Sequence, residues 1–276
     1  MDVDSPPSRT ALATARYRAV HQVRDGGRVL HDPLAVQILG EPTDDLQSAN
    51  VDRRMQLFVC ARARYAEEVL AAAVPHGMDQ LVVLGAGLDT FAYRNPHPEL
   101  RVFEVDYPAT QAWKRSRLEH GGIAVPGSLT FAPTDFETQS VEEGLRGAGF
   151  STEAPAFFSW LGVTMYLSRE AIRSTLRFVA QGTAPGSGIV FDYALAREHL
   201  GLVQRFVYDA LAARVAAAGE PWISTFDPVA LRGELLSLGF SGADDITGDA
   251  LNARYFEGRK DGLRVGGLVR LMRAAV

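Results

Sequence analysis

The stretch that most constrains this chain is Gln80–Thr90, in which four apolar residues lead directly into Gly85, Ala86 and Gly87. A continuous run of Val and Leu without polar alternation is typical of a strand that is covered on both faces of a parallel sheet. Glycines at these two positions let the backbone turn sharply and approach a ligand with no Cβ in the way. The stretch therefore predicts a buried strand that ends in a ligand-binding turn.

A second predicted strand, Arg101–Asp106, ends in an acidic residue about 20 residues after the turn, where a nucleotide-binding βαβ unit places its acceptor for the ribose hydroxyls. We expect Asp106 and its neighbour Tyr107 to contact a nucleoside, although a tight turn without a ligand is the alternative. A dinucleotide fingerprint would have a small residue, Gly or Ala, at Thr90 for a pyrophosphate. Because position 90 is a Thr and not a Gly or Ala, the turn favours a nucleoside ligand without phosphate, above all S-adenosylmethionine.

The strings Leu84–Arg94 and Phe103–Pro108, followed by Lys114, resemble the leucine carboxyl methyltransferase family of S-adenosylmethionine-dependent enzymes, which also includes bacterial small-molecule methyltransferases. The resemblance extends over nearly the whole chain. It implies an α/β fold of the Rossmann-like class I methyltransferase type, with a mostly parallel seven-stranded sheet, helices on both faces and an N-terminal helical cap. We expect one domain over residues 1–276, with the cap at 10–75, the core at 80–276 and a substrate-side helical insertion near 197–218.

Composition supports a globular enzyme. The 276 residues are 47% hydrophobic, which suffices for a sizeable core. The net charge of −5 argues against a nucleic-acid surface, and the single cysteine, Cys60, argues against an internal disulfide or a cysteine-based zinc cluster. There is no basic leader, and the longest apolar stretch is too short for a membrane span. We expect a cytoplasmic monomer or homodimer without nucleic-acid or membrane partners.

The remaining elements follow from apolar spacing and from Gly, Pro and capping residues. Residues 41–50 read as a polar connection, and Tyr255-Phe256 reads as part of one of two last strands. Helices are predicted at 10–23, 34–39, 51–74, 108–120, 168–181, 197–218 and 227–238, and further strands at 129–132, 156–160, 189–193 and 267–271.

The carboxylate of S-adenosylmethionine needs a partner, and a guanidinium can bind it through two parallel hydrogen bonds. The resemblance implies a basic residue in the first helix and an Arg in the helix before the glycine turn, which match Arg16 and Arg62. A shift to Arg64 is an alternative in the second helix. Any of these residues could also lie on a solvated helix face.

The third strand leads into Asp135, Phe136 and Glu137. The family has Asp-Leu-Arg at this point, so the resemblance assigns the first two residues to the adenine. Glu137 takes the place of the family's Arg and would repel a substrate carboxylate by like charge. It is therefore a candidate general base for a hydroxyl acceptor.

The fourth strand leads into Leu161, which takes the place of a family Glu near the ligand, while Gly162 and Tyr166 are retained. Tyr166 is a candidate catalytic residue or substrate contact, with a core aromatic as the alternative. Tyr17 and His199 are further candidate substrate contacts, although a lone His at a helix start is more often a surface residue. Methyl transfer from a sulfonium needs no metal.

These observations predict an S-adenosylmethionine-dependent O-methyltransferase that releases S-adenosylhomocysteine. We expect its acceptor to be a small molecule of specialised metabolism, such as a polyketide or a related natural product. The alternatives are a carboxyl methyltransferase of a protein C-terminus, a nicotinamide-dependent oxidoreductase and a non-catalytic nucleoside-binding protein.

Overall fold

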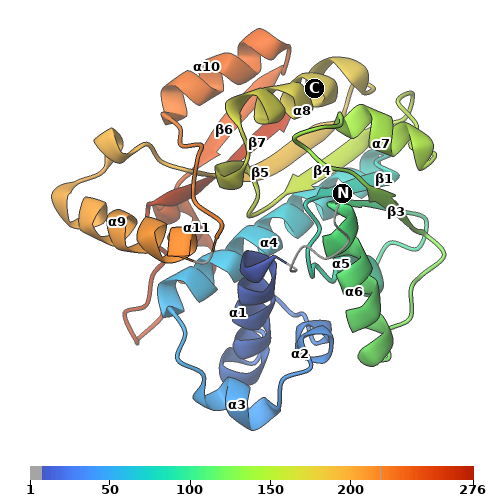
Figure 1. Ribbon diagram of the computed structural model, residues 1–276. Helices are drawn as coiled ribbons and strands as arrows, with labels where there is room; N and C mark the ends of the chain where they lie inside the picture. Colours follow the sequence, from blue (N-terminus) through green and yellow to red (C-terminus); the bar gives the residue numbers. More distant parts are fainter. Residues whose placement is uncertain (1–7, 218) are drawn as a thin grey trace.

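The computed structural model describes residues 8–217 and 219–276, so residues 1–7 and 218 of the predicted domain lie outside it. The strands of its sheet are β1 (Gln80–Leu84), β2 (Arg101–Asp106), β3 (Leu129–Pro133), β4 (Ala156–Trp160), β5 (Gly188–Ala194), β6 (Gly242–Ile246) and β7 (Val269–Ala275). They form one seven-stranded sheet in the order β3-β2-β1-β4-β5-β7-β6 (Figure 1). The first five pair in parallel and β7 is antiparallel to both of its neighbours, which confirms the predicted fold class.

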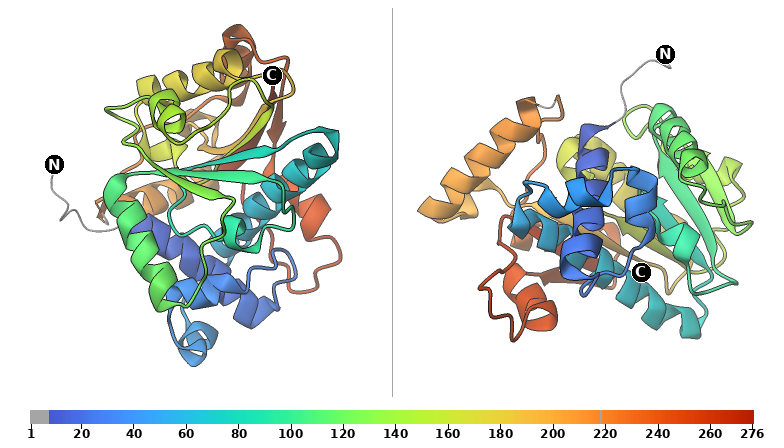
Figure 2. Two further views of the ribbon diagram at one scale, coloured as in Figure 1. Left: turned by 90° about the vertical axis from the view of Figure 1, so that its right-hand side faces the viewer. Right: turned by 90° about the horizontal axis from the view of Figure 1, so that it is seen from below.

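Helices cover both faces of this sheet (Figures 1 and 2). They are α1 (Arg9–Asp25), α2 (Leu34–Leu39), α3 (Thr43–Ser48), α4 (Arg53–Ala73), α5 (Phe91–Arg94), α6 (Pro108–His120), α7 (Val141–Gly147), α8 (Arg169–Gly182), α9 (Leu202–Ala217), α10 (Pro228–Leu238) and α11 (Gly248–Tyr255), with short 3-10 turns η1 (Val74–His76), η2 (Thr164–Tyr166) and η3 (Arg197–His199). Every residue of β1 is buried, because Val82 and Leu84 pack with α7, α8 and α10 while Leu81 and Val83 pack with α4, α5 and α11. The unbroken apolar run of the sequence follows from this two-sided burial.

Four helices were not predicted, namely α3, α5, α7 and α11. The segment read as a polar connection contains α3, which begins after Pro42 and carries two Asp residues in its first turn. Helix α7 begins with a capping box, in which the side chain of Ser140 accepts from the Glu143 N–H and the Glu143 side chain accepts from the Ser140 N–H. This pattern, Ser-x-x-Glu, is readable in the sequence.

Two further predictions were wrong in detail. The single helix expected at 197–218 is interrupted, because η3 ends at His199 and α9 begins only after Gly201. Tyr255 ends helix α11 instead of joining a strand, and the side chain of Thr247 caps the start of that helix by accepting from the Ala250 N–H. The last two strands are β6 and β7.

The N-terminal helices form a layer of their own beside the sheet (Figure 1). Helix α1 packs against α2, α3 and α4. Its apolar core includes Ala15, Ala19, Ile38 and Leu46, and it meets the sheet-bound helix α6 at Leu118. The first turns of α1 thereby face the carboxyl ends of the central strands, which is the position that the predicted cap requires.

Candidate active site

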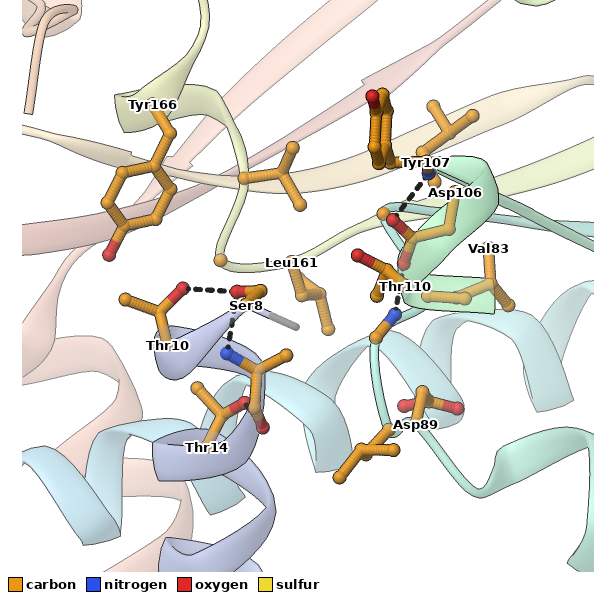
Figure 3. A pocket seen from close by; sticks show the side chains of 18 of the residues that line it. Ser8, Thr10, Thr14, Val83, Asp89, Asp106, Tyr107, Thr110, Leu161 and Tyr166 are labelled. Atoms are coloured by element: carbon orange, nitrogen blue, oxygen red, sulfur yellow. Dashed lines mark hydrogen bonds between the residues drawn. The ribbon is translucent and has the colours of Figure 1, made fainter. Parts of the chain in front are cut away.

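A cavity of about 330 Å³ lies between the carboxyl ends of β1 to β4 and the start of α1. Figure 3 shows Asp106 and Tyr107 on one side of it, Tyr166 on the other, and Ser8 and Thr10 of α1 facing them across the opening. The cavity lies outside the carboxyl edge of a parallel sheet, where open α/β folds bind their ligands. Of the residues proposed from the sequence, it is lined by Arg62, Gly85, Ala86, Gly87, Asp106, Tyr107, Asp135, Phe136, Glu137, Leu161 and Tyr166.

The glycine turn is packed too closely for side chains. Gly85 and Gly87 have φ angles of +66° and +45°, and a Cβ added at Gly85 would lie 2.3 Å from Cγ2 of Val163. The N–H of Gly87 donates to Oδ2 of Asp106 at 2.5 Å, which fixes the turn against the end of β2. Glycine is therefore required here by backbone conformation and by close contact.

Asp106 is held ready to accept hydrogen bonds. Its Oδ1 accepts from the N–H of Tyr107 at 2.7 Å, while Oδ2 accepts from Gly87. Burial raises the pKa of the Asp106 carboxyl, and the two backbone N–H groups and Lys114 oppose this rise. Asp106 lines the cavity, and each of its carboxylate oxygens can accept one more hydrogen bond.

A buried ion pair joins β2 to helix α6. Nζ of Lys114 lies 2.7 Å from Oε2 of Glu104, and both side chains are 1% exposed. The Tyr93 hydroxyl donates to the same carboxylate at 3.4 Å. Burial raises the pKa of Glu104 to about 7. Lys114, which belongs to the family-like motif, therefore supports the site and does not line the cavity.

Arg62, on α4, lines the cavity, and its guanidinium is fixed by a hydrogen bond to Asp192. Its Nη1 donates to Oδ2 of the buried Asp192 at 2.5 Å, and Oδ1 of Asp192 accepts from the N–H of Gly162 at 2.6 Å. A Cβ at Gly162 would lie 2.7 Å from Nη2 of Arg62, so glycine is needed for this packing. Arg64 instead pairs with Glu68 at 2.6 Å on the surface. The structure thus places Arg62, and not Arg64, at the cavity.

The first helix presents a different arginine from the one expected. Arg16 is half-exposed, pairs with Glu41 at 3.0 Å and does not line the cavity. Arg18 lines it, but its guanidinium donates to Asp32 at 3.0 Å and to the Leu88 carbonyl at 2.6 Å. Arg18 therefore orders the loop after the glycine turn, and Arg62 is the arginine with donors left for a ligand carboxylate.

The residues that were assigned to the adenine from the sequence form a connected group with Glu137. The N–H of Glu137 donates to Oδ1 of Asp135 at 3.0 Å, and the ring of Phe136 stacks on Trp160 with 6.4 Å between centroids. The carboxylate of Glu137 accepts from the N–H and the hydroxyl of Ser168 at 3.0 and 2.9 Å. Both of its oxygens are thus bonded to the residue that caps α8, which favours a structural role over a general base.

Tyr166 closes the opposite end of the cavity. Burial raises the pKa of its phenol, and the nearby indole N–H of Trp222 opposes the rise, although this N–H makes no hydrogen bond of good geometry within the described residues. A phenol with a raised pKa is protonated at neutral pH. Tyr166 is therefore a hydrogen-bond donor and not a base.

A second cavity of about 160 Å³ adjoins the first between α1, α4 and α9. The two share Thr10, Val59, Arg62, Gly162 and Tyr166. Its remaining walls are mostly apolar or aromatic, with Ala13, Tyr17, Met55, Phe58, Met165, Leu211, Val215, Trp222 and Val269 beside Arg9 and Arg214.

This second cavity continues into a groove of about 390 Å³ that opens beneath α9. Tyr17, predicted as a substrate contact, lines the second cavity. His199 lines neither cavity nor the groove, because it is exposed and its Nε2 lies 3.1 Å from Asp227.

Among the residues that the sequence analysis missed, two acids hold other parts of the site in place. Asp192 orients Arg62, and its signal in the sequence is an acid within the apolar strand at 189–193. Glu220 accepts from the N–H groups of Arg9 and Thr10 at 2.9 and 3.1 Å, and so fixes the start of α1 at the cavity. The sequence carries no signal for this second contact, because 210 positions separate Thr10 from Glu220.

The donor set fits S-adenosylmethionine. A close glycine turn, an acid at each of two strand ends, an aromatic ring and an arginine all line one cavity. Within the described residues, no group of three His, Cys, Asp or Glu side chains is placed to hold a metal ion. No described helix has the length and apolar character needed to cross a membrane.

Comparison with known proteins agrees with this site. The family model described as leucine carboxyl methyltransferase matches residues 11–180. A Bacillus subtilis protein provisionally named S-adenosyl-L-methionine-dependent methyltransferase YktD is 40% identical over 210 residues, covering 74% of this chain and 67% of that protein. A similarly named protein of Parafrankia sp. is 32% identical over 212 residues, covering 73% of this chain and 66% of that protein. The chain thus matches about two thirds of the length of these relatives.

The fold is shared more widely. A crystal structure of a Thermobifida fusca protein, described provisionally as a methyltransferase, covers 99% of this chain and 96% of its own with a TM-score of 0.59 at 18% identity, which shows the fold alone. The sequence matches, the strand order and the residues that line the first cavity all point to the same family. The chain belongs to the leucine carboxyl methyltransferase family and is an S-adenosylmethionine-dependent methyltransferase.

Proposed function

We propose that this enzyme methylates an oxygen atom of a small molecule of specialised metabolism. The observation that supports this most is the pair of adjoining cavities, which share Arg62, Gly162 and Tyr166 at their junction. The first has the polar groups for a cofactor, and the second is apolar and of small-molecule size. Methyl transfer depends on bringing two molecules into close alignment, and a junction between two pockets does this.

Each polar group of the first cavity binds a different part of S-adenosylmethionine. Asp106 accepts from the ribose hydroxyls, while Asp135 and Phe136 contact the adenine. Arg62, oriented by Asp192, binds the carboxylate, and the glycine turn allows close approach. When bound, the cofactor supplies an electrophilic methyl group on a sulfonium.

The chemistry of the second cavity constrains the acceptor. Its described lining contains no Asp, Glu or His, and Glu137 is bonded to Ser168 outside it. No base is placed there to remove a proton from an ordinary alcohol, whose pKa is high. We infer that the accepting oxygen is acidic enough to react ionised, and that Tyr166 orients it by donating a hydrogen bond. The argument that Glu137 repels an acceptor carboxylate loses its basis, because Glu137 does not line this cavity.

Methyl-labelled S-adenosylmethionine tests the proposal. The protein is incubated with panels of small phenols, enols and carboxylic acids, and the labelled products are treated with alkali. Methyl esters release their label and methyl ethers keep it. We expect labelled small molecules, and calorimetric binding of S-adenosylmethionine but not of NAD. Binding of NAD alone would support the oxidoreductase alternative instead.

A second candidate acceptor is the C-terminal carboxylate of a protein. The family match favours it, and so does the groove beneath α9, which is open enough to admit a chain end. Peptides with a free C-terminus, compared with their C-terminal amides, test it. Alkali-labile labelling of the free peptides alone would favour this candidate over a small molecule.

A further inference from the structure

The second cavity and its groove carry positive charge on a chain whose net charge is −5. Arg9 and Arg214 line the cavity, and Arg54 and Arg214 line the groove. Within residues 8–217 and 219–276, the side chains of these three arginines make no ion pair and no hydrogen bond with another residue. By contrast, Arg62 at the junction is paired with Asp192.

The only acid in these walls is already bonded. Asp52 is the N-cap of α4, and its Oδ1 accepts from the N–H groups of Arg54 and Met55 at 3.0 and 3.1 Å. The remaining arginines therefore have donors and charge available to a ligand. The arginines of these walls outnumber the one carboxylate, Asp52, and such an excess of positive charge raises the local concentration of an anionic ligand.

Helix α9 supplies one wall of this path. Val207, Ala210, Leu211 and Arg214 are spaced three and four residues apart, so they share one face, and all of them line the groove. Leu211 and Arg214 also line the second cavity. In Figures 1 and 2 this helix, in orange, stands at one side of the molecule away from the sheet. The face thus presents apolar contact over its length and a cation at its end.

We propose that the methyl acceptor is an amphipathic small molecule whose apolar body fills the second cavity and which carries, besides the reacting oxygen, an anionic group bound by Arg214, with Arg54, at the groove. The methyl-accepting oxygen then lies at the other end, beside Tyr166. The apolar part contacts Met55, Phe58 and Trp222, which have no charge to satisfy. This inference rests on the proposed function and adds a recognition group that is separate from the reacting oxygen.

A matched pair of fluorescent probes tests whether the arginines of the groove bind an anionic group. 8-Anilinonaphthalene-1-sulfonate carries an anionic group on an apolar ring system, and N-phenyl-1-naphthylamine has the same rings without the charge. Both are titrated into the intact protein saturated with S-adenosylhomocysteine, so that the first cavity is filled. The variants are Arg214→Gln and, as control, Arg177→Gln, which removes an exposed arginine of α8 that lines neither cavity.

We expect Arg214→Gln to raise the dissociation constant of the sulfonate about threefold to tenfold, the scale of one partly exposed charge-assisted contact. The dissociation constant of the neutral probe should change by less than about twofold, because the apolar walls are intact. Arg177→Gln should leave both unchanged. The added variant Arg54→Gln should weaken the sulfonate in the same direction.

Three results would overturn the inference: no binding of the sulfonate by the wild type, equal effects of Arg214→Gln on both probes, or displacement of the sulfonate by S-adenosylhomocysteine. Calorimetry with S-adenosylmethionine separates this failure from that of the proposed function. Normal cofactor binding together with any of these results removes only the acceptor assignment. If the wild-type protein does not bind S-adenosylmethionine, the proposed function itself is wrong.

Discussion

The two cavities are built on different principles. The first lies at the ends of parallel strands, and its polar groups are bonded to protein partners: Asp106 to Gly87, Arg62 to Asp192, and Asp135 to Glu137. The second lies between helices, and within the described part of the chain the side chains of Arg9, Arg54 and Arg214, which line it or its groove, have no protein partner. A group fixed by its neighbours is preorganised for one ligand, whereas unpaired side chains on helices can adapt to several. The first cavity is thus preorganised, and under the proposed function the choice of acceptor depends on the helices that line the second cavity.

The largest expected effect concerns the ion pair beneath the first cavity. Lys114→Met leaves Glu104 buried without its cationic partner, and breaking such a pair typically costs about 3–5 kcal/mol of unfolding free energy. Removing both partners in Glu104→Gln/Lys114→Met should restore most of the loss. Chemical denaturation of the three proteins measures this, and a loss in the double variant as large as in the single one would contradict it.

The same pair predicts a pH dependence. Burial raises the pKa of Glu104 to about 7, from a usual value of 4.5, so the folded protein binds this proton more tightly than the unfolded chain does. The contribution of this group to stability is therefore present at low pH and declines as pH rises from 4.5 toward 7. The double variant should show a flatter decline over this window in denaturation experiments. An identical slope in both proteins would show that other groups set it.

The next effect concerns Asp106. Asp106→Ala removes the acceptor for two backbone N–H groups and for the ribose, so S-adenosylmethionine affinity should fall by roughly 1–3 kcal/mol. Binding of the sulfonate probe in the second cavity should change little, because the two sites share no contact through Asp106. Calorimetry and fluorescence test both halves. Unchanged cofactor affinity would remove the ribose role.

A smaller effect is expected at the junction. Arg62→Lys should raise the dissociation constant of S-adenosylmethionine several-fold, because an ammonium lacks the planar fork that binds Asp192 and a carboxylate together. Arg64→Lys, on the exposed side of the same helix, is the matched control and should bind normally. If Arg64→Lys weakens S-adenosylmethionine binding and Arg62→Lys does not, the contact belongs to Arg64.

The smallest effect on turnover is expected at Glu137. Its carboxylate bonds Ser168, so Glu137→Gln should keep turnover within about threefold and lower stability by about 1 kcal/mol, the usual scale of such a hydrogen bond. A general base would lose about 10²–10⁴-fold. Turnover against pH, measured with the acceptor found by labelling, separates the two, and a loss of that larger size would reinstate the base.

The first cavity was largely readable from the sequence. Strand ends of a parallel sheet meet at one edge, so acids and glycines at the ends of successive strands predict a common site from spacing alone. Gly85, Gly87, Asp106 and Asp135 were found in this way. Arg62 came from the family resemblance, and its partner Asp192 was missed although it stands out as an acid in an apolar strand.

The second cavity was decided by tertiary structure. Helical periodicity shows which face of a helix is apolar, but not which other helix it meets or which of several arginines turns inward. Arg16 was expected at the ligand, yet it pairs with Glu41, and Arg18 two positions later faces the cavity. The glycine turn follows from local sequence, whereas the seven-stranded sheet was expected from the family resemblance and its strand order comes from the structure. The second cavity depends on packing between α1, α4 and α9, and α9 begins more than 120 positions after α4 ends, so no local pattern in the sequence predicts it.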